Sequence, residues 1–449
     1  MEVQRKKLLS SSRPPILKDI ESVRYETIHT SSILPIKDDR SLIFEIPAQK
    51  GFYVDMRNIK IHVRYRVTRK NGSQLAGSDG VTPQSAILYS MFRDLQVNFN
   101  NRTVFWGKFL YGYYTNLLLQ FKIPPNEKTM LQSSIYMYDD NKDLDAVLEG
   151  KEVAQMDGTK KTKMVLTSYT GEAELPEWEN RTSMHLDSAE QEVMGNVLFD
   201  LAFQTRLLRD DINLKFSFTP QNPEFCLLAG KLKSEYTLEI KKAVLQVPRI
   251  SVRPSAGLPG GDIDYYYVEH RMMTLPIPAN TSNFSRTLVS GPLPRRLILC
   301  QVDERAYEGD YKKSFLRFPH YDLDSIQVTI GPRRIPADPL TMDWGEGKEV
   351  LQAYTAFFQN MKNSLGFSGM PFSREEFKED RVYFAFDTTT DMEAGSLHWT
   401  EGNTGNLSLN MHWKNALVDN IVLILCCEYE MVCRIDKFGQ AGIDYAPVY

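Results

Sequence analysis

The chain contains Asp94-Leu95-Gln96-Val97-Asn98-Phe99-Asn100-Asn101-Arg102-Thr103-Val104, and roughly 230 residues later it contains the similar stretch Ser325-Ile326-Gln327-Val328-Thr329-Ile330-Gly331-Pro332-Arg333-Arg334-Ile335. Apolar and polar residues alternate in both copies, and this period of two indicates a half-buried β-strand. Each copy then turns, through Asn100-Asn101 or Gly331-Pro332, and the chain returns. The pattern therefore predicts one β-hairpin that occurs twice, with equivalent strands at Leu95 to Phe99 and Ile326 to Ile330.

Two further pairs of stretches follow the same order along the chain. Phe44-Glu45-Ile46-Pro47-Ala48-Gln49 resembles Leu275-Pro276-Ile277-Pro278-Ala279-Asn280, and Tyr114-Thr115-Asn116-Leu117-Leu118 resembles Tyr354-Thr355-Ala356-Phe357-Phe358. Three echoes at nearly one offset argue for two copies of a single β-rich domain.

The fold class predicted from these patterns is all-β, because short alternating segments joined by turn-rich stretches outnumber helical ones. Two domains of this size with long end-loops and small covering helices favour a double jelly roll, that is, two eight-stranded β-sandwiches. The expected boundaries are an N-terminal arm (1–41), jelly roll 1 (42–252) with a long polar excursion (139–195), a linker (253–264), jelly roll 2 (265–438) and a C-terminal tail (439–449).

Periodicity also places individual elements. Strands are expected at 58–68, 197–203, 212–218, 296–302, 406–413 and 421–435, and the segment 236–252 is expected to close the first domain. Helices are expected at 85–92, capped by Ser85, and at 110–121, where apolar residues recur at helical spacing and Pro124-Pro125 ends the run.

The N-terminal arm carries basic residues, three consecutive serines (Ser10 to Ser12) and the helix-blocking pair Pro14-Pro15. Three interpretations stay open: a disordered terminus, an arm that docks on a neighbouring subunit, or a basic tail that makes weak contact with a genome.

Composition narrows the class of protein. A hydrophobic content of 42% is enough for two cores, and a net charge of −4 argues against a chain that coats nucleic acid. The longest apolar run, Ile421 to Cys427, is far shorter than the roughly 18 residues of a membrane span. The first residues lack the apolar core of a signal peptide, so we expect no standard secretion. The five cysteines are expected to be small buried hydrophobes, with a disulfide or metal framework as the alternative: Cys226, Cys300, Cys426, Cys427 and Cys433.

Catalytic and metal-binding patterns do not emerge from the sequence. The acidic run Asp139 to Asp145 fails as a calcium loop, because Leu144 and Gly150 stand where glycine and a carboxylate are needed. His398-Trp399 and His412-Trp413 are expected to be packed or edge residues. No spacing pairs the strand carboxylates Glu224, Glu269, Glu428 and Glu430 as glycoside hydrolysis requires. We therefore predict no catalytic residue, no cofactor and no metal.

The ordered motifs resemble those of the major capsid proteins of Polinton/Maverick elements, also called adintoviruses, over roughly residues 40–440. The motifs are Phe44-Glu45-Ile46-Pro47-Ala48, Asp94-Leu95-Gln96-Val97, Asp211-Ile212-Asn213-Leu214-Lys215-Phe216, Glu224-Phe225-Cys226-Leu227, Tyr311-Lys312-Lys313, Arg374-Glu375-Glu376-Phe377, Phe384-Ala385-Phe386-Asp387, His398-Trp399 and Gly405-Asn406-Leu407. This resemblance implies a double jelly roll whose homotrimers look pseudo-hexagonal and tile an icosahedral shell.

The leading hypothesis is thus a structural, non-enzymatic capsid protein. Its expected partners are other copies of itself, neighbouring capsomers and a penton or minor capsid protein, without sequence-specific nucleic-acid binding or a membrane span. Its expected location is the virion, after synthesis in the host cytoplasm and assembly there or in the nucleus. Two alternatives stay open: a carbohydrate- or receptor-binding β-sandwich, with a host-domesticated copy as one form of it, and a glycan-cleaving enzyme.

Overall fold

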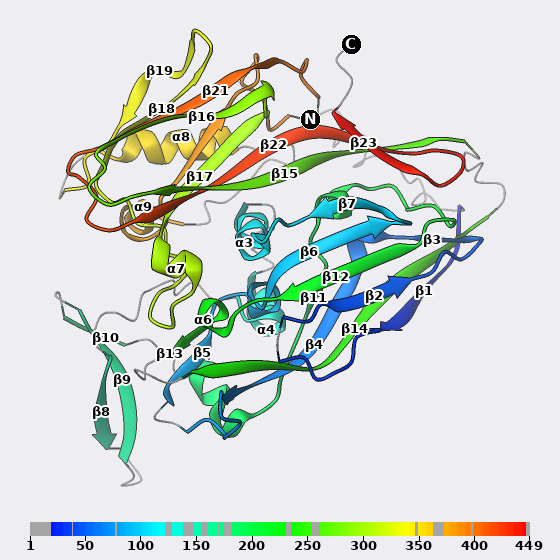
Figure 1. Ribbon diagram of the computed structural model, residues 1–449, viewed down its shortest axis with the longest axis horizontal. Coiled ribbons are helices and arrows are strands. Elements are labelled where there is room, and N and C mark those ends of the chain that lie inside the picture. The colour runs from blue at the N-terminus through cyan, green and yellow to red at the C-terminus, as the bar shows by residue number, and fades with distance from the viewer. Residues whose placement is uncertain are drawn as a thin grey trace, which may run out of the picture.

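The computed structural model describes residues 19–37, 39–76, 79–121, 128–137, 148–154, 160–168, 171–174, 181–229, 235–253, 261–345, 349–361, 372–396 and 398–445. Two β-sandwiches follow one another along the chain and lie one against the other (Figure 1). We call them the first and the second sandwich, and letter the eight strands of each from B to I in chain order.

The first sandwich consists of two four-stranded antiparallel sheets. Its strands B to I are β1 (Ile20–His29), β2 (Leu42–Ile46), β4 (Lys60–Arg69), β6 (Phe92–Phe99), β7 (Arg102–Trp106), β11 (Gln191–Asn196), β12 (Leu214–Pro220) and β14 (Tyr236–Val252). One sheet has the order β1-β14-β4-β11 and the other β2-β12-β6-β7, which is B-I-D-G over C-H-E-F. The short strand β3 (Phe52–Val54) adds to β14, and β5 (Val81–Pro83) pairs with β13 (Leu227–Ala229).

The second sandwich repeats this arrangement. Its strands B to I are β15 (Ile263–Ile277), β16 (Asn283–Pro292), β17 (Arg296–Asp303), β18 (Leu323–Ile330), β19 (Arg333–Thr341), β20 (Tyr383–Asp387), β21 (Thr404–Trp413) and β22 (Ile421–Ile435). The sheet orders β15-β22-β17-β20 and β16-β21-β18-β19 are again B-I-D-G and C-H-E-F. A final strand, β23 (Ala441–Tyr445), pairs with β22.

The repeated strand order confirms the predicted double jelly roll. Leu95 to Phe99 lies in β6 and Ile326 to Ile330 in β18, so both predicted stretches form strand E. Each strand E pairs with strand H on one side and with strand F on the other, through a hairpin. The predicted duplication therefore describes a real structural repeat.

Short helices close the sandwiches. In the first they are α2 (Ile87–Ser90), α3 (Tyr111–Phe121), α4 (Lys128–Ile135), α6 (Pro223–Cys226) and the 3₁₀ helices η1 (Met56–Asn58), η4 (Leu186–Ser188) and η5 (Asp200–Phe203). In the second they are α7 (Glu304–Glu308), α8 (Leu351–Met361) and α9 (Arg374–Glu379). Helices α3 and α8 both follow strand F, as the echo between Tyr114 and Tyr354 predicted.

The similar stretches 44–49 and 275–280 do not mark equivalent strands. Phe44 lies in β2, strand C of the first sandwich, whereas Leu275 lies in β15, strand B of the second. In both places Pro-Ala follows the last strand residue, Ile46 or Ile277. The similarity reflects this shared strand ending, because proline lacks the N–H that would continue a ladder.

The strand predicted at 197–203 is wrong. Strand G is β11, which ends at Asn196, and Asp200–Phe203 forms η5 instead. The apolar residues that suggested a strand are instead buried by the short helix. Leu201 and Ala202 are both buried, and η5 packs against β15. The predicted cap is also wrong: helix α2 starts at Ile87, after Ala86 in a left-handed conformation.

The N-terminal arm is shorter than predicted. Residues 1–18 lie outside the described residues, but Ile20–His29 forms β1 and pairs along its length with β14. An edge strand has a hydrogen-bonded neighbour on one side only and can expose both faces, so its polar sequence looked like an arm. The C-terminal tail similarly contains β23.

The polar excursion contains a sheet of its own. Strands β8 (Leu148–Ala154), β9 (Lys160–Ser168) and β10 (Gly171–Glu174) pair in the order β10-β9-β8 and stand apart from the sandwiches at the lower left of Figure 1. The last residues of the predicted excursion, 191–195, belong instead to strand β11 of the first sandwich. The acidic run at 139–145 and most of the linker lie outside the described residues.

Strand β22 is buried along nearly its whole length. Its sheet has the core of the second sandwich on one face and the first sandwich against the other (Figure 1). A strand buried on both faces needs a nearly continuous apolar run, which explains the sequence Ile421 to Cys427.

Candidate functional site at the junction of the sandwiches

Helix α3 of the first sandwich lies between the two sandwiches (Figure 1), and all eleven of its residues are buried. Aromatic side chains cover its outer face. The rings of Tyr113 and Phe315 lie 5.5 Å apart, Phe225 stacks on Phe315 at 4.3 Å, and Phe121 meets Tyr383 edge-on at 5.2 Å. Such ring pairs contribute about 0.5–1.5 kcal/mol each beyond the burial of their surface, so the two sandwiches share one apolar core.

A buried ionic network crosses this junction. Asp200 of η5 lies opposite His270 of β15, with 2.7 Å between Asp200 Oδ1 and His270 Nδ1. Asp200 Oδ2 accepts the backbone N–H of His270 at 3.1 Å, and the Tyr114 hydroxyl donates to Oδ1 at 2.9 Å. The side chains of Asp200 and His270 are only 3% and 6% exposed. Burial, and then the neighbouring Asp200, raise the pKa of Tyr114, so this hydroxyl remains a donor.

The network continues into the second sandwich through Glu428 of β22. Its Oε1 lies 3.6 Å from His270 Nε2, and its Oε2 lies 3.1 Å from Nη1 of Arg296 on β17. Buried carboxylates are tolerated only when cations and hydrogen bonds compensate for the lost hydration. Here Asp200 and Glu428 flank one histidine, and Arg296 pairs with Glu428. The arrangement joins the two domains through side chains that are almost completely buried.

The four carboxylates noted in the sequence each have a partner of their own. The Tyr311 hydroxyl donates to Glu224 at 3.4 Å, Arg271 pairs with Glu269 at 2.6 Å, and Arg295 pairs with Glu430 at 2.9 Å. Glu428 belongs to the network above. Burial raises the pKa of Glu430, although Arg295 partly opposes this. These contacts are local ion pairs and hydrogen bonds, and they do not bring two of the carboxylates together as a catalytic pair.

The two His-Trp pairs do not meet in one site. His398 is more than half exposed and pairs with Asp391 at 2.7 Å. His412 contacts Ser282 and Asn283, whereas Trp413 is buried and donates to Gln301 at 3.1 Å. All five cysteines are buried thiols outside any disulfide, as the first interpretation of them predicted.

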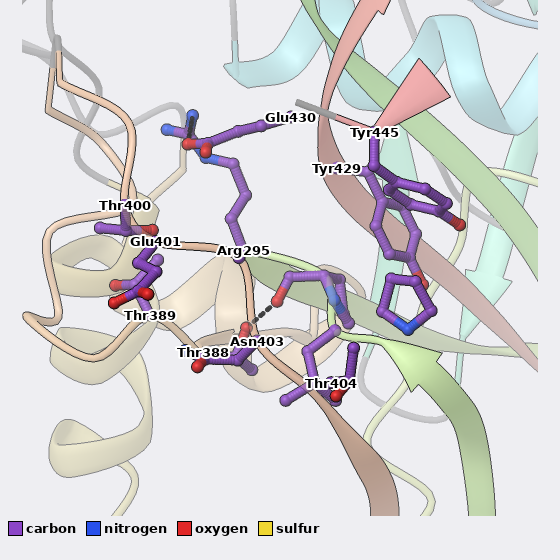
Figure 2. A pocket seen from close by; sticks show the side chains of 14 residues that line it. Arg295, Thr388, Thr389, Thr400, Glu401, Asn403, Thr404, Tyr429, Glu430 and Tyr445 are labelled. Carbon is purple, nitrogen blue, oxygen red and sulfur yellow. Dashed lines mark hydrogen bonds and ion pairs between the residues drawn. The ribbon is translucent and has the colours of Figure 1, made fainter. Parts of the chain in front are cut away.

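A pocket of about 140 Å³ opens near the end of the second sandwich (Figure 2). Tyr429 and Tyr445 line one side, and Thr400 and Glu401 lie on the other. Arg295 extends between them toward Glu430. A second pocket, of about 210 Å³, lies beside the junction, and its lining includes Trp106, Asp200, His270 and Arg271.

Within the described residues, His, Cys, Asp and Glu side chains do not gather in threes as a metal site would need. Among the same residues, none of the helices has the length and apolar character to cross a membrane.

Comparison with known proteins assigns the fold. The chain resembles a protein chain in the cryo-EM structure of the Sputnik virophage, at 13% identity and a TM-score of 0.62, over 97% of this chain and 91% of that one. It resembles a chain of the PBCV-1 virus capsid at 10% identity and a TM-score of 0.58, over 98% of this chain and 100% of that one. It also resembles the mavirus major capsid protein, at 12% identity and a TM-score of 0.53, over 98% of this chain and 93% of that one. The fold is thus the double jelly roll of these viral proteins, over nearly the full length.

Sequence comparison adds less. No protein-family model matches the chain. An uncharacterised protein of Caenorhabditis elegans is 22% identical over 274 residues, or 56% of this chain. The match spans 63% of that protein's length.

Sequence reasoning missed the central pair of the junction. Asp200 was assigned to a strand, and His270 lies between the charged residues Glu269 and Arg271, so neither stood out. The available signal was the rarity of buried charge: a histidine within a long apolar strand usually has a buried partner.

Proposed function

We propose that this chain is a major capsid protein of a Polinton/Maverick (adintovirus) type element. Three copies form a homotrimer of pseudo-hexagonal outline, and these capsomers tile an icosahedral virion shell. The single observation that carries the proposal is the tandem repeat of one B-I-D-G/C-H-E-F sandwich, which matches viral capsid chains over nearly the whole length.

The buried junction supports this role. A shell subunit with two domains must transmit lateral forces without the domains separating, and here the aromatic layer and the network of Asp200, His270 and Glu428 join them. Lateral contacts between permanent subunits need interfaces on the order of 2,000 Å² or more. A rigid two-domain body can supply such areas on its flanks.

The remaining parts of the proposal concern boundaries and partners. We propose that the two jelly rolls act as the domains, that the basic N-terminal residues make weak contact with the genome, and that a penton or minor capsid protein completes the shell. The chain acts as a structural protein, with no catalytic residue, cofactor or metal. It resides in the virion, and assembly takes place in the cytoplasm or nucleus of the host.

The test is the mass of the purified full-length chain by light scattering across a concentration series. We expect a species of three chains, each of 51.6 kDa. A mass that stays at one chain at the highest concentration would reject the capsid proposal.

A further inference from the structure

The contact between the two sandwiches joins unlike surfaces of two like domains. The first sandwich contributes α3, the segment between strands G and H with Asp200, and the segment between H and I with Phe225. The second contributes strand B with His270, the segment between D and E with Phe315, and strand G with Tyr383. A contact of this kind is heterologous.

A heterologous contact between repeated domains leaves one unused surface on each. The first sandwich still has its own strand B, β1. The second still has the exposed start of its own F-to-G helix, α8, at Leu351, and its own segment between H and I, residues 414–420. Farther along α8, Phe357 is already used, because its ring meets that of Phe121 on α3 at 5.3 Å. If the same contact forms once more between two molecules, these two surfaces meet.

The pairing register identifies the residues of β1 that correspond to the buried face of β15. Strand D begins at Lys60 in the first sandwich and at Arg296 in the second. In the first sandwich, Lys60 pairs with Gln246 of strand I, which pairs with Thr27 of strand B. In the second, Arg296 pairs with Glu428 of strand I, which pairs with His270 of strand B. Thr27 therefore occupies the position of His270. Tyr25 and Val23 lie on the same face of β1 as Thr27, because side chains alternate along a strand.

The unused sheet surface exposes apolar side chains. Tyr25 is 63% exposed and Val23 is 51% exposed. His270, at the matching place in the second sandwich, is buried by the first. Exposed apolar groups gathered on one face of an edge strand are typical of an interface that is covered in the assembly.

The unused end of the second sandwich shows the same feature. Val418, in the segment between H and I, is 88% exposed, and Leu351, at the start of α8, is 54% exposed. Both belong to one end of the sandwich. The segments that lead into both residues are anchored at the start of strand E. The indole N–H of Trp344, ahead of α8, donates to the carbonyl of Leu323 at 2.7 Å. The backbone N–H of Lys414, ahead of Val418, donates to the carbonyl of Asp322 at 3.0 Å.

We infer that the end of the second sandwich that carries Leu351 and Val418 docks on the outward face of β1, around Val23 and Tyr25, of a second copy of this chain. This inference rests on the proposed self-assembly and names the surfaces that make it. Each molecule then presents one surface of each kind, so identical contacts continue from copy to copy until the ring closes.

The test uses two charge-introducing variants, Tyr25→Asp and Val418→Asp, with Phe438→Asp as the matched control. Phe438 is 75% exposed and lies in neither surface. Circular dichroism and thermal melting establish that each variant folds, which the exposure of all three positions favours. Light scattering then gives the mass of each variant alone and of a one-to-one mixture of the first two.

We expect the wild type and Phe438→Asp to assemble, and Tyr25→Asp and Val418→Asp each to remain single chains. In the mixture, the intact end of Tyr25→Asp meets the intact β1 of Val418→Asp, so a species of two chains should appear. Assembly of both variants like the wild type would overturn the inference and leave the proposed function standing. A mixture that remains single would overturn the heterologous contact. A wild type that remains single at every concentration would instead reject the proposed function.

Discussion

Asp200 Oδ1 lies 2.7 Å from Nδ1 of His270, and the same carboxylate accepts the backbone N–H of that histidine. One side chain of the first sandwich therefore holds both the ring and the main chain of a strand in the second. Because the two side chains are almost completely buried, water is a poor substitute for either partner. This pair fixes the position of one sandwich on the other.

Replacing Asp200 with alanine should strongly destabilise the protein. The change leaves the ring and amide of His270, and the Tyr114 hydroxyl, without their shared acceptor. Removal of one partner from a buried ion pair typically costs about 3–5 kcal/mol in the free energy of unfolding. Denaturant unfolding of wild type and variant measures the difference.

The matched control is Asp391→Ala, which removes the exposed pair between Asp391 and His398 at the same 2.7 Å separation. Exposed pairs contribute little because water screens them, so its unfolding midpoint should barely move. Equal losses at the two positions would contradict the assignment of Asp200 as the residue that holds the junction.

Gly107→Ala should also destabilise the fold, for a steric reason. A Cβ at this position would lie 2.8 Å from Oδ1 of Asp94. The other oxygen of this carboxylate, Oδ2, accepts the indole N–H of Trp106 at 2.7 Å. Overpacking of this kind typically costs about 1–3 kcal/mol. Gly442→Ala is the control, because a Cβ there meets nothing within 4 Å. Thermal melts should separate the two variants, and indistinguishable melting temperatures would refute this account of Gly107.

The five thiols should resist modification in the folded protein. All are buried, and burial raises the pKa of Cys427 and of Cys433 to about 12, so the reactive thiolate is scarce at neutral pH. A thiol-specific chromogenic reagent should react slowly with the native chain and with all five cysteines after denaturation. Rapid reaction of any thiol under native conditions would show that its strand opens.

Stability should fall as the pH drops from 7 to 5. Burial lowers the pKa of His185, which contacts the Tyr65 hydroxyl at 3.1 Å and the carbonyl of Arg181 at 2.7 Å. Below the unfolded value of about 6.5, the unfolded chain takes up a proton that the folded chain refuses, so protonation favours unfolding. Burial lowers the pKa of His320 with the same sign.

The check is the free energy of unfolding measured at several pH values for wild type and for His185→Gln. The variant should show a shallower decrease between pH 7 and 5 than the wild type. An unchanged slope would mean that His185 already titrates at its ordinary value in the folded state.

Local patterns were sufficient for much of the fold. The predicted strand 421–435 has the bounds that the structure shows for β22, because a long apolar run is a property of neighbouring residues. The repeated hairpin also emerged from adjacent residues. Strand β1 was missed because an edge strand that exposes Val23 and Tyr25 lacks the burial that makes alternation visible.

The junction was beyond such reasoning. Asp200 and His270 are 70 positions apart, and their contact depends on how two complete domains pack. Similarly, the exposed apolar residues Leu351 and Val418 acquire a meaning only when the contact inside the chain is compared with the unused surfaces. Tertiary packing, which a single sequence does not display, decides both.

Electron microscopy of the purified full-length protein tests the central claim most directly. The account predicts particles built from three chains, in which six similar sandwiches surround one axis and the contact within a chain alternates with a like contact between chains. Class averages that show single two-lobed molecules, or pairs related by a two-fold axis, would contradict it.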